Sequence, residues 1–206
     1  MRRFILGIAI FWVAVIATLG AGPVRAAAPS IEEALADKVM GRADAPVTII
    51  EFASLTCQFC ARFHNDILPR LKAEFIDPGK VRLIYRDFPL DPLAQAAAMM
   101  ARCAEPMRYF SFLEALFQSQ PNWSEAADPL ATLAMIGRLG GMSQQDFDSC
   151  LRNQELLEGI NAGKDKAMVE FGIERTPTFI INGERYVGLM PFEDFEEILK
   201  PLLARP

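Results

Sequence analysis

Two cysteines separated by two residues, placed directly after an apolar stretch, constrain this chain more than any other feature. The segment reads Ile49-Ile50-Glu51-Phe52-Ala53-Ser54-Leu55-Thr56-Cys57-Gln58-Phe59-Cys60. It predicts a strand, a short break and then a helix whose first turn carries both cysteines. Unpaired backbone N–H groups and the positive end of the helix dipole favour an anion there. We therefore expect Cys57 to ionise more readily than a free thiol, whose pKa is about 8.5.

The spacing of Cys57 and Cys60 predicts a redox pair. Two intervening residues bring Cys60 round about one turn of the helix, within reach of a disulfide with Cys57. In such a pair Cys57 attacks and Cys60 resolves the mixed disulfide. A structural disulfide and half of a zinc site are the other interpretations of the motif. A zinc site needs a second cysteine pair at short spacing, which Cys103 and Cys150 do not provide.

The composition bounds the remaining classes of function. With 206 residues, 51% of them hydrophobic, the chain can form one domain with an insertion, or two small domains. Its net charge is −5, and no basic patch suited to nucleic acid follows from that balance, so we expect no nucleic-acid partner. The single histidine, His64, excludes a histidine-rich metal site, and we expect no metal.

The N-terminus predicts export. Two arginines precede a long, uncharged and mostly apolar run, and small residues at the spacing that a signal peptidase requires follow it. We expect a signal peptide over residues 1–26, cleaved after Ala26 or Ala28, with an uncleaved membrane anchor as the alternative. The rest of the chain then works in the periplasm, where disulfides persist. Cys103 and Cys150 are expected to form a structural disulfide there, with a redox role coupled to the first pair as the alternative.

Hydrophobic periodicity and turn signals predict strands at both ends of the chain and helices between them. In chain order the expected elements are strand 47–52, helix 58–75 with a kink near Leu68 at Pro69, strand 81–86, helices only from 91 to about 160, a helix over 160–171, strand 176–181, the Asn182-Gly183 hairpin turn, strand 184–188 and helix 192–203. Within the helical part we expect Asp91 and Asp128 to cap helices, residues 143–146 to form a capping box and residues 121–123 to form a loop. We expect its aromatic residues to be mostly core. The first strand, helix and strand predict a parallel, right-handed βαβ unit.

Three features together resemble the DsbA family of periplasmic disulfide oxidoreductases, which have a thioredoxin fold. They are the Cys57–Cys60 motif, Thr176-Pro177 before a strand, and a helical insertion between the two. The resemblance covers residues 47–203 and implies an α/β, thioredoxin-like fold with an inserted all-helical domain. The parts expected in chain order are a signal peptide (1–26), an N-terminal linker (27–46), the first part of the thioredoxin-like domain (47–90), the helical insertion (91–160) and the second part of the thioredoxin-like domain (161–206).

The resemblance also implies a substrate-binding segment beside the cysteines. The Thr176–Pro177 bond is expected to be cis and to face the Cys57 thiol. The exposed peptide groups of Arg175 and Thr176 would then pair with an extended substrate chain.

Glu51, six residues before Cys57, matches the buried acid that family members carry at the end of their first strand. We expect it to relay a proton to Cys60, with an ordinary strand-end charge as the alternative. His64 lies about two helical turns beyond Cys57, on the order of 10 Å away and too far for direct proton transfer, so we expect a packed or surface histidine.

The function implied by the resemblance is donation of the Cys57–Cys60 disulfide to reduced, newly exported proteins through a mixed disulfide at Cys57. It also implies reoxidation by a quinone-linked, DsbB-like membrane oxidase, and no cofactor. The chain departs from the family at Gln58-Phe59, where DsbA-type oxidases usually carry Pro-His. Without that histidine we expect a less depressed Cys57 pKa and a more reducing potential. A reductase or isomerase that uses the same site, and a non-enzymatic chaperone for unfolded chains, are the alternatives.

Overall fold

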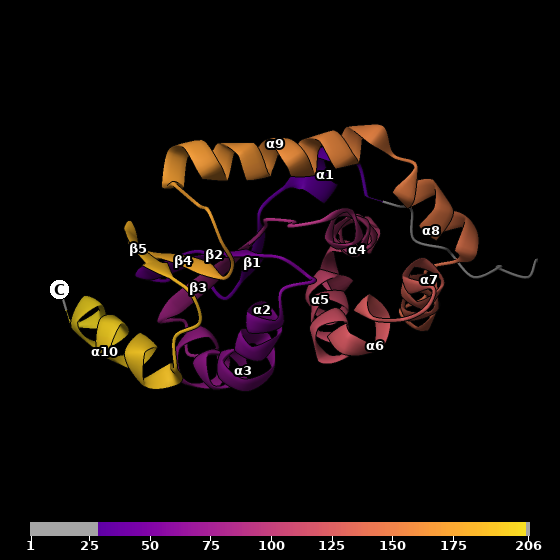
Figure 1. Cartoon of the computed structure of the whole chain (residues 1–206). Coiled ribbons are helices and arrows are strands. Elements are labelled where there is room, and N and C mark those ends of the chain that lie inside the picture. The colour runs from indigo at the N-terminus through magenta and orange to yellow at the C-terminus, as the bar shows by residue number, and fades with distance from the viewer. Residues whose placement is uncertain (1–28, 205–206) are drawn as a thin grey trace, which may run out of the picture.

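A five-stranded mixed sheet, with its strands in the order β1-β3-β2-β4-β5, forms the centre of the protein (Figure 1). This computed structural model describes residues 29–204, so the expected signal peptide over 1–26 lies outside the described residues. The strands are β1 Lys38–Met40, β2 Val47–Ala53, β3 Val81–Asp87, β4 Thr178–Ile181 and β5 Glu184–Val187. Strands β2 and β3 run parallel, and the other neighbouring pairs are antiparallel.

Strands β2 and β3 are mostly buried because helices cover the sheet on both sides (Figure 1). Helix α9 passes over one side, and α3 and α10, Phe192–Leu203, lie on the other. The expected strand–helix–strand order, with β2 parallel to β3, is confirmed. Glu51 is the charged residue of β2, and its side chain is fully buried.

The crossover between β2 and β3 is helical throughout but not uniformly α-helical. It consists of α2 Gln58–Arg62, the π-helical η1 Phe63–Ile67, α3 Leu68–Leu71 and the π-helical η2 Lys72–Ile76. Pro69 has no N–H to donate, so one hydrogen bond of a regular α-helix cannot form here. The helix takes the wider π-helical form of η1 directly before this residue. The disturbance predicted near Leu68 is therefore a change of helix type within a continuous helical segment.

Helices make up the insertion, as expected. They are α4 Pro92–Cys103, the 3-10 helix η3 Pro106–Arg108, α5 Tyr109–Gln118, α6 Gln120–Ser124, α7 Pro129–Leu139 and α8 Gln144–Leu151. Asp91 and Asp128 cap α4 and α7, and a capping box begins α8, as predicted. The expectation of a loop at residues 121–123 is wrong. These residues belong to α6. Pro121 lies in the first turn of this helix, where its missing N–H costs no hydrogen bond within the helix.

Helix α9, Gln154–Phe171, joins the insertion to the sheet (Figure 1). The helix expected to begin at residue 160 is thus six residues too short, and the boundary placed at residue 160 lies inside α9. The side chain of Asn153 explains the earlier start, because it accepts a hydrogen bond from the Leu156 N–H and caps the helix there.

The N-terminal segment is not the linker that was expected. Residues 29–46 contribute α1, Ile31–Leu35, and β1, which pairs antiparallel with β3 and forms one edge of the sheet. A strand of three residues is too short to display an alternating pattern, and its partner lies more than 40 residues away in the sequence. Pairing with β3, rather than local propensity, therefore decides this strand.

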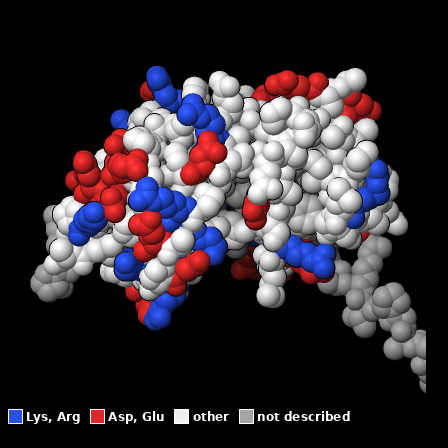
Figure 2. Space-filling model, turned by 90° about the horizontal axis from the view of Figure 1, so that it is seen from below, with Lys and Arg blue, Asp and Glu red and all other residues white. Residues whose placement is uncertain are grey.

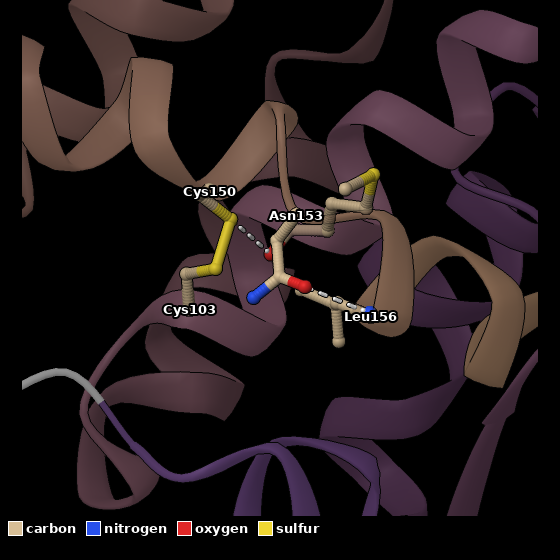
Figure 3. Close-up of a disulfide and its surroundings, with 5 residues drawn as sticks. Cys103, Cys150, Asn153 and Leu156 are labelled. Carbon is tan, nitrogen blue, oxygen red and sulfur yellow. Dashed lines mark hydrogen bonds between the residues drawn. A yellow bond between two sulfur atoms is a disulfide. The ribbon is translucent and has the colours of Figure 1, made fainter.

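Cys103 and Cys150 form a disulfide between the C-terminal ends of α4 and α8 (Figure 3). The two cysteines are 47 residues apart, and a loop of this length corresponds to about 4 kcal/mol of stabilisation on the chain-entropy model. The disulfide holds two helices of the insertion together. No helix within residues 29–204 is long and apolar enough to span a membrane.

Two large clusters of buried apolar side chains lie in the fold. One fills the space under the sheet with side chains from α3, η2 and α10. The other joins the insertion to the sheet and contains both Cys57 and Cys60. Leu116, Phe117 and Trp123 are fully buried in this second cluster, so the prediction that the aromatic residues of the insertion are mostly core is confirmed. The two cysteines accordingly lie at the junction between the two parts of the chain.

Candidate active site

Cys57 is the N-cap residue of α2, and its backbone is extended at φ −80° and ψ 115°. Its sulfur accepts a hydrogen bond from the Cys60 N–H at 3.4 Å. A helix N-terminus is the position at which unpaired N–H groups and the helix dipole favour a negative charge. The local sequence therefore places the Cys57 sulfur where a thiolate is stabilised.

The environment separates the two thiols chemically. The hydrogen bond from the Cys60 thiol is the main cause that lowers the pKa of Cys57 to about 6, and burial opposes it. Thr176 and the backbone N–H groups of Phe59 and Cys60 lower this pKa further. Burial raises the pKa of Cys60 well above its usual range, and the nearby charges of Cys57 and Glu51 add to the effect. At neutral pH, Cys57 is ionised and Cys60 keeps its proton.

Solvent access follows the same division. Cys57 is 9% exposed and Cys60 is 0% exposed, so an attacking sulfur reaches the pair through Cys57. Cys57 itself is largely buried, because the insertion packs against its loop. Both residues are free cysteines in this structure.

Titration of Cys57 is a direct test of this electrostatic environment. We expect the ultraviolet absorbance of the thiolate to appear with a midpoint near pH 6 in the reduced protein. Because this pKa lies below that of a free thiol, about 8.5, ionisation stabilises the folded reduced form. That stabilisation is complete above about pH 8.5 and is lost as the pH falls through about 6. A Cys57→Ser variant should lack the transition, and a midpoint near 8.5 or near 3.5 would contradict the expectation.

The Thr176–Pro177 segment lies against Cys57, and its peptide bond is cis. The Cys57 sulfur lies 3.4 Å from the Thr176 carbonyl oxygen, and in its protonated form it donates a hydrogen bond to that oxygen. The hydroxyl of Thr178 donates to the Arg175 carbonyl at 2.7 Å, so this carbonyl, which was expected to be open to a substrate, is engaged. Arg175 is exposed, whereas the Thr176 hydroxyl is buried and has no hydrogen-bond partner among residues 29–204.

The insertion fixes the loop that leads into α2. The side-chain amide of Gln120 in α6 donates to the carbonyls of Leu55, at 2.7 Å, and Cys57, at 3.1 Å. The Thr56 hydroxyl donates to the Asp91 carboxylate at 2.6 Å. Sequence reasoning missed these contacts, because Gln120 lies 63 residues from Cys57 and carries no local signal. Asp91 was predicted only as a helix cap, which is its second role.

His64 contacts Glu51, a pairing that the sequence did not predict. Its Nε2 atom lies 3.1 and 3.0 Å from the two carboxylate oxygens of Glu51. The imidazole stacks on Phe117 with the ring centroids 4.1 Å apart. The packed histidine that was expected is therefore present, but it is partnered with the acid. The spacing of four residues between Cys60 and His64 was the available signal, because it places both on one helical face.

The surface near the site is partly apolar. Phe59 is 45% exposed and Leu90 is 50% exposed. A groove between α5 and α7 has a volume of about 620 Å³ and is lined by Phe112, Ile136 and Leu139 among others. Figure 2 shows charged side chains gathered over α10 and α3, whereas the face over α5 and α6 carries few. Within residues 29–204 no cluster of three or more His, Cys, Asp or Glu side chains is arranged to hold a metal ion.

Comparisons with known proteins agree with this geometry. A family model described as Thioredoxin matches residues 33–201. The chain is 30% identical over 148 residues to a Rickettsia bellii protein provisionally named a protein-disulfide oxidoreductase, and the match covers 71% of this chain and 57% of that protein. The chain thus spans little more than half the length of this relative. It is also 27% identical over 172 residues to disulfide bond formation protein D of Bacillus subtilis, covering 78% of this chain and 72% of that protein.

Solved structures share the fold. Alpha-DsbA1 of Wolbachia pipientis is 32% identical, with a TM-score of 0.76 over 82% of this chain and 91% of that chain. Oxidised BdbD from Bacillus subtilis is 23% identical, with a TM-score of 0.74 over 86% of this chain and 97% of that chain. The expected α/β, thioredoxin-like fold with a helical insertion is confirmed by these matches.

Proposed function

The chain belongs to the thioredoxin family as a DsbA-like member, and on that premise we propose that it is a thiol:disulfide oxidoreductase. The observation that carries the proposal is the unequal pair of thiols at the start of α2. Cys57 has a pKa of about 6 and limited access to solvent, whereas Cys60 is fully buried and protonated. A low-pKa thiolate is a good leaving group in disulfide exchange, and a buried neighbour resolves the intermediate.

The proposed reaction begins with the Cys57–Cys60 disulfide. A substrate thiolate attacks the Cys57 sulfur, the bond between the two enzyme sulfurs breaks, and its electron pair passes to Cys60, which takes up a proton. A second substrate thiolate then attacks the substrate sulfur of the mixed disulfide and releases Cys57 as a thiolate. The substrate dithiol is oxidised to a disulfide, and the enzyme disulfide is reduced to two thiols.

Donation of disulfides is the direction we favour, with newly exported, reduced proteins as the substrates. The apolar exposed residues Phe59 and Leu90, together with the weakly charged face over α5 and α6, fit unfolded chains. Thr176 and Pro177, which lie against Cys57, would align such a chain beside the sulfur, with Arg175 at the exposed edge. In the disulfide form Cys57 has no proton to donate, so the Thr176 carbonyl can accept a hydrogen bond from the substrate backbone.

The location and the partner that complete this cycle are the periplasm and a quinone-linked, DsbB-like membrane oxidase. The basic and apolar N-terminal sequence supports export, and a soluble disulfide donor needs an oxidant after each turnover. The reductase or isomerase alternative rests on one observation. Phe59 places no positive charge beside Cys57, and the pKa of about 6 lies in the upper part of the range of about 3.5–7.5 for activated cysteines.

The equilibrium potential of the Cys57/Cys60 couple distinguishes the two directions. We expect a value between those of a strong oxidase, about −120 mV, and of thioredoxin, about −270 mV, because the thiolate is stabilised only in part. The protein would be equilibrated with mixtures of reduced and oxidised glutathione, and its thiols trapped and counted. A Cys103→Ser/Cys150→Ser variant serves as the control that the measured couple is the first pair. A potential at or below about −270 mV would make the protein a reductant rather than a donor.

A further inference from the structure

Each turn of the proposed reaction changes the protonation of a sulfur that solvent does not reach. Cys60 is 0% exposed, and burial strongly favours its thiol form over its thiolate. When the enzyme disulfide opens, the electron pair arrives on this buried atom. A proton must therefore reach Cys60 through the protein, from a group that can carry one.

Glu51 and His64 are the acid–base pair beside this sulfur. Cys60 and His64 are four residues apart on one helical segment, and Glu51 lies in β2 beneath it, near enough that its charge acts on Cys60. The two carboxylate oxygens of Glu51 lie 3.1 and 3.0 Å from Nε2 of His64. A hydrogen bond at that distance requires one proton between the two groups, so the pair shares a transferable proton.

The two members of this pair differ in their access to solvent. The side chain of Glu51 is 0% exposed, whereas that of His64 retains 5%. Phe117 stacks on the imidazole and Tyr85 and Phe63 meet it edge-on, so the ring is held with Nε2 toward the acid. Of the two side chains, only the His64 imidazole can connect the Glu51 carboxylate to solvent.

We propose that His64 is the proton port of the buried thiol: it carries protons between solvent and Glu51, and Glu51 passes them to the Cys60 sulfur. This inference rests on the proposed function. Cys60 and Glu51 exchange the proton directly, whereas His64 acts through Glu51 and is a positioning residue.

In disulfide donation, the bond between the Cys57 and Cys60 sulfurs breaks and the Cys60 sulfur, which holds the electron pair, takes a proton from the Glu51 carboxyl. The His64 imidazole then takes a proton from solvent and passes it to the Glu51 carboxylate, which restores the shared proton. In the reverse step, the Cys60 thiol gives its proton to Glu51, attacks the Cys57 sulfur and expels the substrate thiolate.

Other ionisable groups face this pair from the surrounding elements and offer a competing route. Tyr85 in β3 and Tyr109 in α5 are buried, and their hydroxyls have no hydrogen-bond partner within the described part of the chain. The nearest charged side chains beyond them are Asp87 in β3, Arg102 in α4 and Lys38 in β1. A path through the tyrosines would bypass His64, and a test must therefore separate the two.

A His64→Gln variant separates them. Glutamine can still donate a hydrogen bond to Glu51 but cannot carry a proton. We expect the attack of Cys60 on a preformed mixed disulfide between Cys57 and glutathione to slow about 10-fold at pH 7, a modest share of what general acid–base catalysis provides. The pH dependence of this step should also differ from that of the wild type. Tyr85→Phe, the matched control, should leave both rate and profile unchanged.

Further variants distinguish proton transfer from packing. Glu51→Gln should slow the same step, and the Glu51→Gln/His64→Gln double variant should be no slower than Glu51→Gln alone, because His64 acts through Glu51. Should His64→Gln fold poorly, His64→Ala with added imidazole replaces it, and we expect the rate to return with rising imidazole. The Cys57 titration midpoint should not move in His64→Gln.

Several results would overturn the inference. His64 would be rejected as the proton port if His64→Gln kept the wild-type rate and pH profile. It would also be rejected if Tyr85→Phe slowed the step as well, or if the losses in the double variant were additive. These failures are distinct from failure of the proposed function, in which the wild-type protein itself would form no mixed disulfide at Cys57.

Discussion

Replacing Cys57 with serine should reduce thiol–disulfide exchange to the uncatalysed rate. A serine hydroxyl is not ionised near neutral pH and forms no disulfide, so the helix N-terminus would have no nucleophile to stabilise. The measurement is the initial rate of oxidation of a dithiol peptide by the preoxidised protein. Loss of that rate, with an unchanged circular dichroism spectrum, would place the chemistry at Cys57.

Two further variants make this prediction specific. Cys60→Ser should still attack through Cys57 but should accumulate mixed disulfides, visible as adducts by mass spectrometry, because the resolving thiol is missing. The Cys103→Ser/Cys150→Ser variant should keep its exchange rate while the protein becomes less stable. A chaperone without redox activity predicts the opposite, namely that Cys57→Ser keeps full activity in preventing aggregation. That outcome, with no exchange by the wild type, would refute the proposed enzyme.

Replacing Arg102 with glutamine should lower the free energy of unfolding by about 3–5 kcal/mol, the usual cost of breaking a buried ion pair from one side. Arg102 in α4 bonds to the Asp87 carboxylate at the end of β3, and also donates to the carbonyls of Ala34 and Ala36 at the C-terminal end of α1. Arg102 and Asp87 are both buried. The variant would leave a buried carboxylate without its charge partner, and urea unfolding of the oxidised protein would measure the loss.

A neighbouring ion pair provides the matched control. Arg86 precedes Asp87 in β3. Its guanidinium donates two hydrogen bonds to the Asp37 carboxylate, but this ion pair is partly exposed. Arg86→Gln should therefore cost less than about 1 kcal/mol. Equal losses in the two variants would show that burial does not govern these interactions. A small loss for Arg102→Gln would mean that the buried pair does not hold the insertion to the sheet.

The elements that the sequence predicted well are those whose signals are local. The apolar run before Cys57, the Asn182-Gly183 turn and the amphipathic pattern over 192–203 each identify an element from adjacent residues alone. Asn182 and Gly183 both adopt positive φ angles, as the hairpin turn requires. The helix caps Asp91 and Asp128 were also predictable from the sequence, because a capping side chain accepts a hydrogen bond from a residue only three positions away.

The elements that the sequence missed depend on distant partners. Strand β1 exists because β3 pairs with it, and Lys38 is buried opposite Tyr85 although its own sequence signals a solvated charge. The start of α9 was missed because the chain breaks for only two residues after α8, too few for a loop signal. In both cases the tertiary structure overrides a weak local pattern.

By itself, the sequence determined that two thiols would sit at the start of a helix after a buried strand, since spacing and periodicity dictate that placement. Only the tertiary structure decided what surrounds them. The amide of Gln120 on the Cys57 loop, the carbonyl of Thr176 at the sulfur and the imidazole of His64 on Glu51 come from segments 13 to 119 residues away from their partners. Hydrogen bonds of that range depend on how helices and strands pack, and packing brings together residues that no local pattern relates.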